Sequence, residues 1–274
     1  MRKVELARTG EKIPVIGQGT FSLNKWAKKY YSQWKHSLHK GIELGMTHID
    51  TAEVYGFGRA ERMVGEVIAE YDRDDLFITS KLSPVHFLYN RMKKAAYNSL
   101  KRLNLDYFDL YLIHWPNPAV SVKKYMRVLE DLVKEGRTRY IGVSNYSVNQ
   151  VVTAQNVLKG AEIVTNQVRA NVVKQKHIKS LPYYQKEGIT LTAYSPLGQR
   201  GFKSLKGKIR KTLECVAASH QATIQQVALA WLINMDRMIT IPKAFQISHI
   251  EANAKAAEIV LTPEEMNMLS ESPV

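Results

Sequence analysis

The sequence predicts an α/β protein that forms one closed barrel of eight parallel strands, each followed by a helix. Short apolar, β-branched segments alternate with longer amphipathic segments eight times along the chain, and no Pro- or Ser-rich linker interrupts the alternation. The length of 274 residues is close to the roughly 250 residues usual for one α/β barrel. We therefore expect residues 1–274 to form a single domain.

The predicted strands are short and rich in Val, Ile, Leu and Thr. They lie at residues 15–18, 47–50, 76–79, 110–113, 140–143, 162–165, 189–192 and 238–241. Helices are predicted between them, most clearly at residues 60–70, 90–103, 122–135 and 223–235. In the third helix Tyr125, Val128, Leu129 and Leu132 recur with the period of a helix that buries one face.

The segment ends carry further signals. Glycines are expected where helices end, at Gly41, Gly45, Gly136, Gly160 and Gly188. Residues 4–13, with a turn at Gly10, predict a hairpin that covers the floor of the barrel.

Composition excludes several classes of protein. With 45% hydrophobic and 23% charged residues the chain is ordinarily globular. Its longest apolar run, residues 227–233, is far shorter than the ~18 residues that a membrane span needs. Its first residues have no apolar core typical of a secretory signal. A single cysteine, Cys215, excludes an intrachain disulfide and favours a reducing, cytoplasmic setting.

The net charge of +14 is compatible with nucleic acid, an anionic small molecule or simply a basic surface. The basic residues are dispersed along the chain rather than gathered in a tail or a stripe with interleaved aromatics. This distribution favours solvated helix faces over a nucleic-acid partner.

Polar side chains stand at the carboxyl end of each predicted strand. They are Gly19-Thr20, Asp50, Lys81, His114, Ser144-Asn145, Asn166-Gln167, Tyr194-Ser195 and Lys243. In a parallel barrel these ends meet at one mouth, where such barrels place their active sites. Because strand ends also meet solvent, some polar residues are expected there without any function. A nearly complete ring that includes Asp, Lys, His and Tyr instead favours a catalytic site.

Four residues of this region suggest acid–base chemistry. Asp50 and Lys81 end neighbouring strands, Tyr55 follows Asp50 closely, and His114 ends the next strand. A free tyrosine has a pKa of about 10, and we expect the Lys81 ammonium to lower the pKa of Tyr55. His114 would orient a substrate oxygen or relay a proton. The set suits protonation of a developing alkoxide, with no metal; the alternative is a structural Asp–Lys pair beside an unrelated tyrosine.

Reduction of a carbonyl group also requires hydride, which no side chain can supply, so a cofactor is expected. No complete Gly-x-Gly-x-x-Gly fingerprint follows a strand. Ser144, Asn145 and Gln167 suit hydrogen bonds to a carboxamide, and the Tyr194 ring suits stacking on a nicotinamide. Lys243, with Asn253 beyond it, suits an adenosine phosphate.

Taken together, these segments resemble the aldo-keto reductases. The resemblance rests on Asp50-Thr51-Ala52 with Tyr55-Gly56, Thr79-Ser80-Lys81, Leu112-Ile113-His114-Trp115-Pro116, Gly142-Val143-Ser144-Asn145, Asn166-Gln167, Tyr194-Ser195-Pro196-Leu197 and Ile241-Pro242-Lys243. It implies a (β/α)8 barrel that binds NAD(P)H in extended form and reduces aldehydes and ketones reversibly. It also implies that Tyr55 is the general acid, tuned by Lys81 and Asp50, with His114 orienting the carbonyl.

The resemblance further implies a set of cofactor contacts. They are Gly19, Thr20, Asp50, Ser144, Asn145, Gln167, Tyr194, Ser195, Leu197, Gly198, Lys243, Ala244, His249 and Asn253. Relatives that prefer NADPH usually carry Ser or Thr where this chain has Ala244, and Arg where it has His249. Because the anion contacts are weaker here, we expect NADPH to be used with poorer discrimination against NADH than in relatives that carry Ser and Arg.

The substrate side of the mouth departs from the family pattern as well. Phe21 and Trp115 match aromatic wall positions, beside Tyr55 and His114, but Ser83 stands where a Trp is frequent. The loop at residues 115–122 is short, and we expect an open site of broad carbonyl specificity.

Other segments near this mouth have weaker assignments. His86, Phe87 and Tyr89 are rim candidates, and residues 198–207, with Arg200, Lys203 and Lys206, form a candidate basic flap. A catalytically silent nucleotide-binding barrel that regulates or scaffolds a partner is the alternative function. We expect a monomer or weak dimer, with no nucleic acid or membrane partner.

Overall fold

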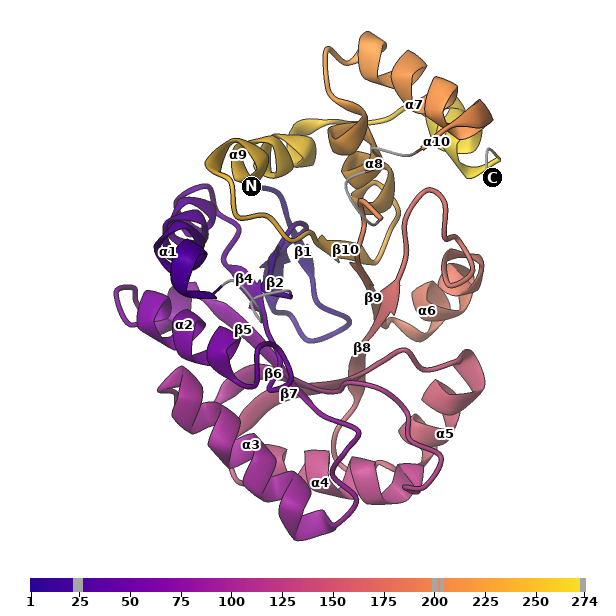
Figure 1. The fold of residues 1–274 in the computed structure, drawn as a ribbon. Helices are drawn as coiled ribbons and strands as arrows, with labels where there is room; N and C mark the ends of the chain where they lie inside the picture. Colours follow the sequence, from indigo (N-terminus) through magenta and orange to yellow (C-terminus); the bar gives the residue numbers. More distant parts are fainter. Residues whose placement is uncertain (22–26, 199–201, 203–204, 272–274) are drawn as a thin grey trace.

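The computed structural model describes residues 1–21, 27–198, 202 and 205–271, except the side chains of residues 27–29. Eight parallel strands form one sheet in chain order. Their bounds are β3 Gln18–Gly19, β4 His48–Asp50, β5 Phe77–Leu82, β6 Phe108–Ile113, β7 Thr138–Ser144, β8 Ile163–Arg169, β9 Thr190–Tyr194 and β10 Met238–Ile241. A parallel bridge between Ile16 and Thr240 joins the two edges of the sheet. The predicted eight-stranded barrel is therefore confirmed (Figure 1).

Helices lie around the outside of this ring of strands (Figure 1). Their bounds are α1 Ala27–Glu43, α2 Arg59–Ile68, α3 Tyr89–Leu103, α4 Val122–Lys134, α5 Val148–Val157, α6 Leu181–Glu187, α7 Gly207–Ser219, α8 Ile224–Ile233, α9 Ile247–Lys255 and α10 Pro263–Ser270, with 3-10 turns at Arg73–Asp75, Ile178–Ser180 and Ala256–Glu258. Ser121, Ser147, Thr223 and Thr262 cap α4, α5, α8 and α10, each accepting a hydrogen bond from a backbone amide of the first turn. No helix in the described ranges combines the length and apolar character needed to cross a membrane.

The predicted hairpin covers the amino-terminal end of the barrel. β1 (Lys3–Glu5) pairs antiparallel with β2 (Lys12–Pro14). Ile13 of β2 and Leu6, which follows β1, are buried in one cluster with Leu110, Val164 and Ile239 of the barrel strands. The hairpin thus closes the floor, as expected from the sequence.

One predicted helix end and four predicted strand ends are wrong. Gly41 does not end a helix but lies inside α1, where a Cβ atom would come within 2.0 Å of the Gln18 side chain. Glycine is needed there because Gln18 donates to the carbonyls of Leu38 and Met46 across this contact. Several strands also extend further than predicted: Lys81, Ser144, Gln167 and Tyr194 lie within β5, β7, β8 and β9 rather than after them.

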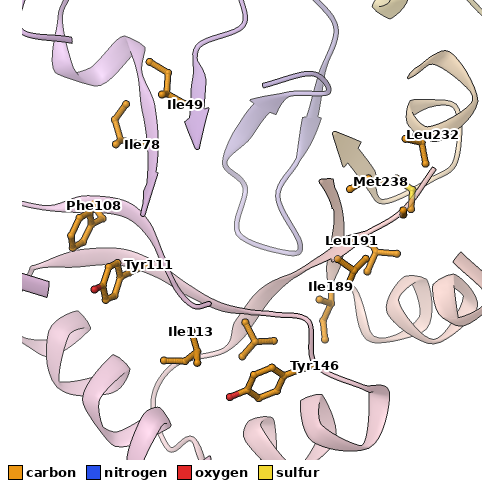
Figure 2. Close-up of a cluster of buried hydrophobic side chains, with 14 of the residues drawn as sticks. Ile49, Ile78, Phe108, Tyr111, Ile113, Tyr146, Ile189, Leu191, Leu232 and Met238 are labelled. Atoms are coloured by element: carbon orange, nitrogen blue, oxygen red, sulfur yellow. The ribbon is translucent and has the colours of Figure 1, made fainter. Parts of the chain in front are cut away.

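The main core lies between the strands and the surrounding helices. Figure 2 shows part of it, including Ile49, Ile78, Tyr111 and Leu191 on the strands. The rings of Phe108 and Tyr111 stack with centroids 4.5 Å apart. Burial of each large apolar side chain contributes about 1.5–3 kcal/mol, and this packing fixes the strands whose ends form the mouth.

Candidate active site

A buried hydrogen-bonded chain joins three barrel strands at the mouth. Asp50 at the end of β4 accepts a hydrogen bond from the Lys81 ammonium of β5 at 2.5 Å. Its second carboxylate oxygen accepts from the Gln167 amide of β8 at 2.7 Å. Asp50, Lys81 and Gln167 are all at most 3% exposed. Because every oxygen of this carboxylate has a partner, the charged pair is held in one arrangement.

Tyr55 reaches this chain from the loop that follows β4. Its hydroxyl lies 3.4 Å from the Lys81 Nζ, which also donates to the Thr51 carbonyl at 2.8 Å. The chain turns sharply after Tyr55, because Gly56, Phe57 and Gly58 all adopt positive φ. The expected grouping of Asp50, Lys81 and Tyr55 is therefore present in the structure.

The expected net change in the pKa of Tyr55 is wrong. Burial raises the pKa of the Tyr55 phenol, and the Lys81 ammonium opposes this rise without reversing it. Burial also disfavours the charge on Lys81, but Asp50 and Tyr55 outweigh that effect and raise the pKa of the Lys81 ammonium. The phenol thus stays protonated and the amine stays charged near neutral pH.

His114 lies beside the Tyr55 ring. The two ring centroids are 5.7 Å apart and the rings meet edge to face. Burial, with the nearby Lys81 charge, lowers the pKa of His114 to about 3. The imidazole is therefore neutral at physiological pH, and its Nδ1 atom is buried without a hydrogen-bond partner among the described residues.

The expected amide-binding residues are assembled next to this group. Ser144 Oγ donates to the Gln167 carbonyl at 2.8 Å, and Asn145 Nδ2 donates to Ser144 Oγ at 2.9 Å. The Tyr194 hydroxyl donates to the Asn145 side-chain oxygen at 2.9 Å. The Tyr194 ring is thereby fixed at the mouth, beside the three side chains that suit a carboxamide.

The predicted adenosine contacts follow β9 and β10. Lys243 is exposed and its Nζ lies 5.9 Å from the Trp34 ring and 5.3 Å from the Phe245 ring. Other predicted contacts differ in exposure: Gly19, Thr20, Ala244 and Asn253 are buried, Ser195, Leu197 and Gly198 are half-buried, and His249 is exposed. The aromatic support under Lys243 was not foreseen, because Trp34 lies on distant α1.

The predicted substrate walls have mixed outcomes. Phe21 is 59% exposed and meets the Tyr55 ring edge-on at 5.3 Å, and Trp115 is 47% exposed. Ser83, in contrast, is only 1% exposed, so its side chain does not open onto the mouth. Its amide donates to Glu53 at 2.6 Å.

Two loops of the rim are tied together by Glu53, a residue that the sequence did not single out. Its carboxylate contacts His86 at 3.1 Å as well as the Ser83 amide. Phe87 is exposed, and Tyr89 begins α3. Most of the predicted flap, including Arg200 and Lys203, lies outside the described residues, whereas Lys206 directly precedes α7.

Comparisons with known proteins agree with this geometry. The model of the aldo/keto reductase family matches residues 15–272. Methylglyoxal reductase YeaE of Escherichia coli is 34% identical over 262 residues, which cover 95% of this chain and 91% of that protein. A thermostable aldo-keto reductase crystallised with the inhibitor epalrestat superposes with a TM-score of 0.91 at 39% identity, covering 98% and 99% of the two chains. An aldo/keto reductase from Klebsiella pneumoniae in complex with NADP and acetate gives a TM-score of 0.88 at 34% identity, covering 97% and 93%. The chain therefore belongs to the aldo/keto reductase family.

Proposed function

We propose that this protein reduces aldehydes and ketones to alcohols with NADPH, and that Tyr55 donates the proton. The observation that carries the assignment is the position of the Tyr55 hydroxyl, 3.4 Å from an ammonium whose charge Asp50 maintains. A protonated phenol beside a fixed positive charge suits transfer of a proton to a developing alkoxide.

The residues of the mouth fit a nicotinamide dinucleotide. Ser144, Asn145 and Gln167 provide the amide and hydroxyl groups that a carboxamide needs, and the Tyr194 ring lies next to them. Bound NADPH supplies the hydride that the carbonyl carbon receives. Lys243 and the start of α9, whose Gln246 makes no side-chain cap, suit the 2′-phosphate.

The side chains around the carbonyl oxygen of the substrate have different roles. Neutral His114 orients the oxygen by hydrogen bonding, while Tyr55 gives up its proton as negative charge develops there. Lys81 then stabilises the phenolate that remains, and Asp50 keeps the Lys81 charge in place. The net charge of the Asp50–Lys81 pair does not change during this transfer.

The substrate class follows from the walls of the mouth. Phe21 and Trp115 are exposed apolar surfaces, and the loop between β6 and α4 is short, so the proposal is a broad range of small carbonyl compounds. The methylglyoxal reductases among the relatives favour inclusion of 2-oxoaldehydes. The proposal also comprises one catalytic domain over residues 1–274, a cytoplasmic location and a monomeric or weakly dimeric state.

Steady-state oxidation of NADPH with methylglyoxal, an aromatic aldehyde and a simple ketone tests this function. We expect turnover with more than one of them, and loss of turnover but not of NADPH binding in the Tyr55→Phe variant. Tight NADPH binding without turnover of any carbonyl compound would instead support the regulatory or scaffold function.

A further inference from the structure

Arg169, the last residue of β8, lies at the mouth of the barrel. Side chains alternate along a strand, and Gln167 points into the barrel, where it contacts Asp50. Arg169 follows on the same face, and its register partner in β9 is Tyr194. Burial raises the pKa of Tyr194, and the charge of Arg169 opposes that rise. The guanidinium therefore lies close to the expected position of the nicotinamide.

The guanidinium of Arg169 differs from those of other partly buried arginines. Of these, Arg73 and Arg102 each form an ion pair with a buried carboxylate. Arg137 and Arg237 donate to backbone carbonyls instead. Arg169 has no such pair among the described residues, and its Nε atom is buried without a hydrogen-bond partner there. A guanidinium whose donors have no protein acceptor is suited to an anionic ligand.

A cavity of about 180 Å³ adjoins this guanidinium. Its lining includes two cationic side chains, Arg169 and Lys174, together with Asn171, Gly198 and Phe202, and none of its described lining residues is acidic. Asn171 fixes the cavity wall: its Nδ2 donates to the Ser195 carbonyl at 3.0 Å, and its Oδ1 accepts from the Lys174 amide at 2.9 Å. Lys174 therefore lies on a loop that Asn171 holds in place, directly after the strand that carries Arg169.

We propose that Arg169 and Lys174 bind a phosphoryl group, namely the diphosphate of the dinucleotide. The assignment rests on the proposed cofactor and adds contacts from β8 and its following loop. The cavity is lined by Arg169, whose register partner is Tyr194, and by Gly198 of the segment that follows β9. It would therefore adjoin the nicotinamide end of an extended dinucleotide. Lys243, two residues beyond β10, is left for the distant 2′-phosphate.

Cofactor binding to variants of the purified protein tests the proposal. Dissociation constants for NADPH and NADH would be measured by quenching of tryptophan fluorescence in Arg169→Gln, Arg169→Lys, Lys174→Gln and Lys243→Gln. We expect Arg169→Gln to weaken both cofactors by about tenfold to a hundredfold. The factor should be equal for both, because both carry the diphosphate. Lys243→Gln should instead lower the preference for NADPH over NADH.

The variant Arg169→Lys separates the effect of the bidentate donors from that of the charge, and a further variant, Arg127→Gln, is the control. Arg169→Lys keeps the charge but loses the bidentate fork, so its affinity should lie between those of the wild type and Arg169→Gln. Arg127→Gln removes an exposed arginine of α4 and should change neither affinity. The thermal midpoint of each variant would show whether it is folded.

Competition with inorganic phosphate distinguishes the two possible phosphoryl ligands of this cavity, the diphosphate of the cofactor and free phosphate. Competition of phosphate with NADH in the wild type, reduced in Arg169→Gln, would support the proposal. Unchanged affinity of folded Arg169→Gln for both cofactors would overturn the proposal. This holds even if the variant no longer binds inorganic phosphate at a site where phosphate does not compete with NADH. Cofactor binding by a wild type that turns over no carbonyl compound would overturn the proposed function alone.

Discussion

The Tyr55 hydroxyl lies 3.4 Å from the Lys81 ammonium, and the same ammonium lies 2.5 Å from the Asp50 carboxylate. Lys81 thus contacts both the Asp50 carboxylate, which keeps the ammonium charged, and the Tyr55 hydroxyl, whose phenolate the ammonium can stabilise after proton loss. Burial nevertheless raises the pKa of Tyr55 above its ordinary value. The arrangement consequently favours a tyrosine that is protonated before the reaction and stabilised as an anion after it.

The first prediction concerns pH. Because the pKa of Tyr55 is raised above its ordinary value of about 10, kcat/KM for reduction should stay flat between about pH 6 and 9. His114, with a pKa of about 3, should add no acid limb in that range. Oxidation of the alcohol needs the phenolate, so its rate should rise with pH over the same interval. A loss of reductase activity with a midpoint near pH 7 would contradict this account.

The second prediction concerns the buried ion pair. Asp50→Asn leaves the Lys81 charge unpaired, and Lys81→Met leaves the Asp50 charge unpaired, so each variant should lose about 3–5 kcal/mol of unfolding free energy. The double variant should lose less than the sum, because neither charge is then isolated. Urea unfolding of the four proteins gives the coupling free energy. Additive losses would show that the two groups stabilise the fold independently.

The third prediction concerns acid stability. Burial is the main cause that lowers the pKa of His48 to about 4. Since the unfolded chain binds this proton near pH 6.5, stability is full above that pH and falls as the pH drops toward 4. The loss from this residue should be about 2 kcal/mol between pH 6.5 and 5.

Urea unfolding at both pH values measures this effect. The loss should be smaller in His48→Gln, and the exposed His36 of α1 provides the control variant His36→Gln. An equal pH dependence in His48→Gln and the wild type would rule out a contribution from His48.

The fourth prediction concerns cofactor preference. Ala244 and His249 lack the hydroxyl and the permanent charge that would hold a 2′-phosphate, so the preference for NADPH should remain below about a thousandfold in kcat/KM. Ala244→Ser and His249→Arg should each raise the preference by about tenfold, through added charge-assisted hydrogen bonds. Steady-state kinetics with both cofactors measures the ratio. A wild-type preference above that limit would contradict the prediction.

The sequence was sufficient to predict the barrel and the polar residues around its mouth, because both depend on local patterns. Alternation of strands and helices predicts the topology, and the polar residues at strand ends predict the grouping of Asp50, Lys81 and Tyr55. The net pKa shift of Tyr55 was not predictable in this way. It depends on how far the surrounding chain removes the hydroxyl from water, which spacing along a sequence does not report.

Long-range side-chain contacts were also beyond the sequence. Glu53 binds the loop that follows β5, and Ser83 is buried beneath that contact rather than exposed on the substrate wall. No motif of the sequence singled out Arg169, whereas the structure shows its Nε atom buried without a hydrogen-bond partner among the described residues. Such features follow from packing between distant segments.

The most direct test of the central claim is the kinetics of Tyr55→Phe with a good carbonyl substrate. The account predicts that kcat/KM falls by about a hundredfold to ten-thousandfold, while the dissociation constant for NADPH stays unchanged. The phenyl ring keeps the packing against Phe21 and His114, so the loss would report the missing proton donor. Ordinary turnover by this variant would contradict the role of Tyr55 and, with it, the mechanism.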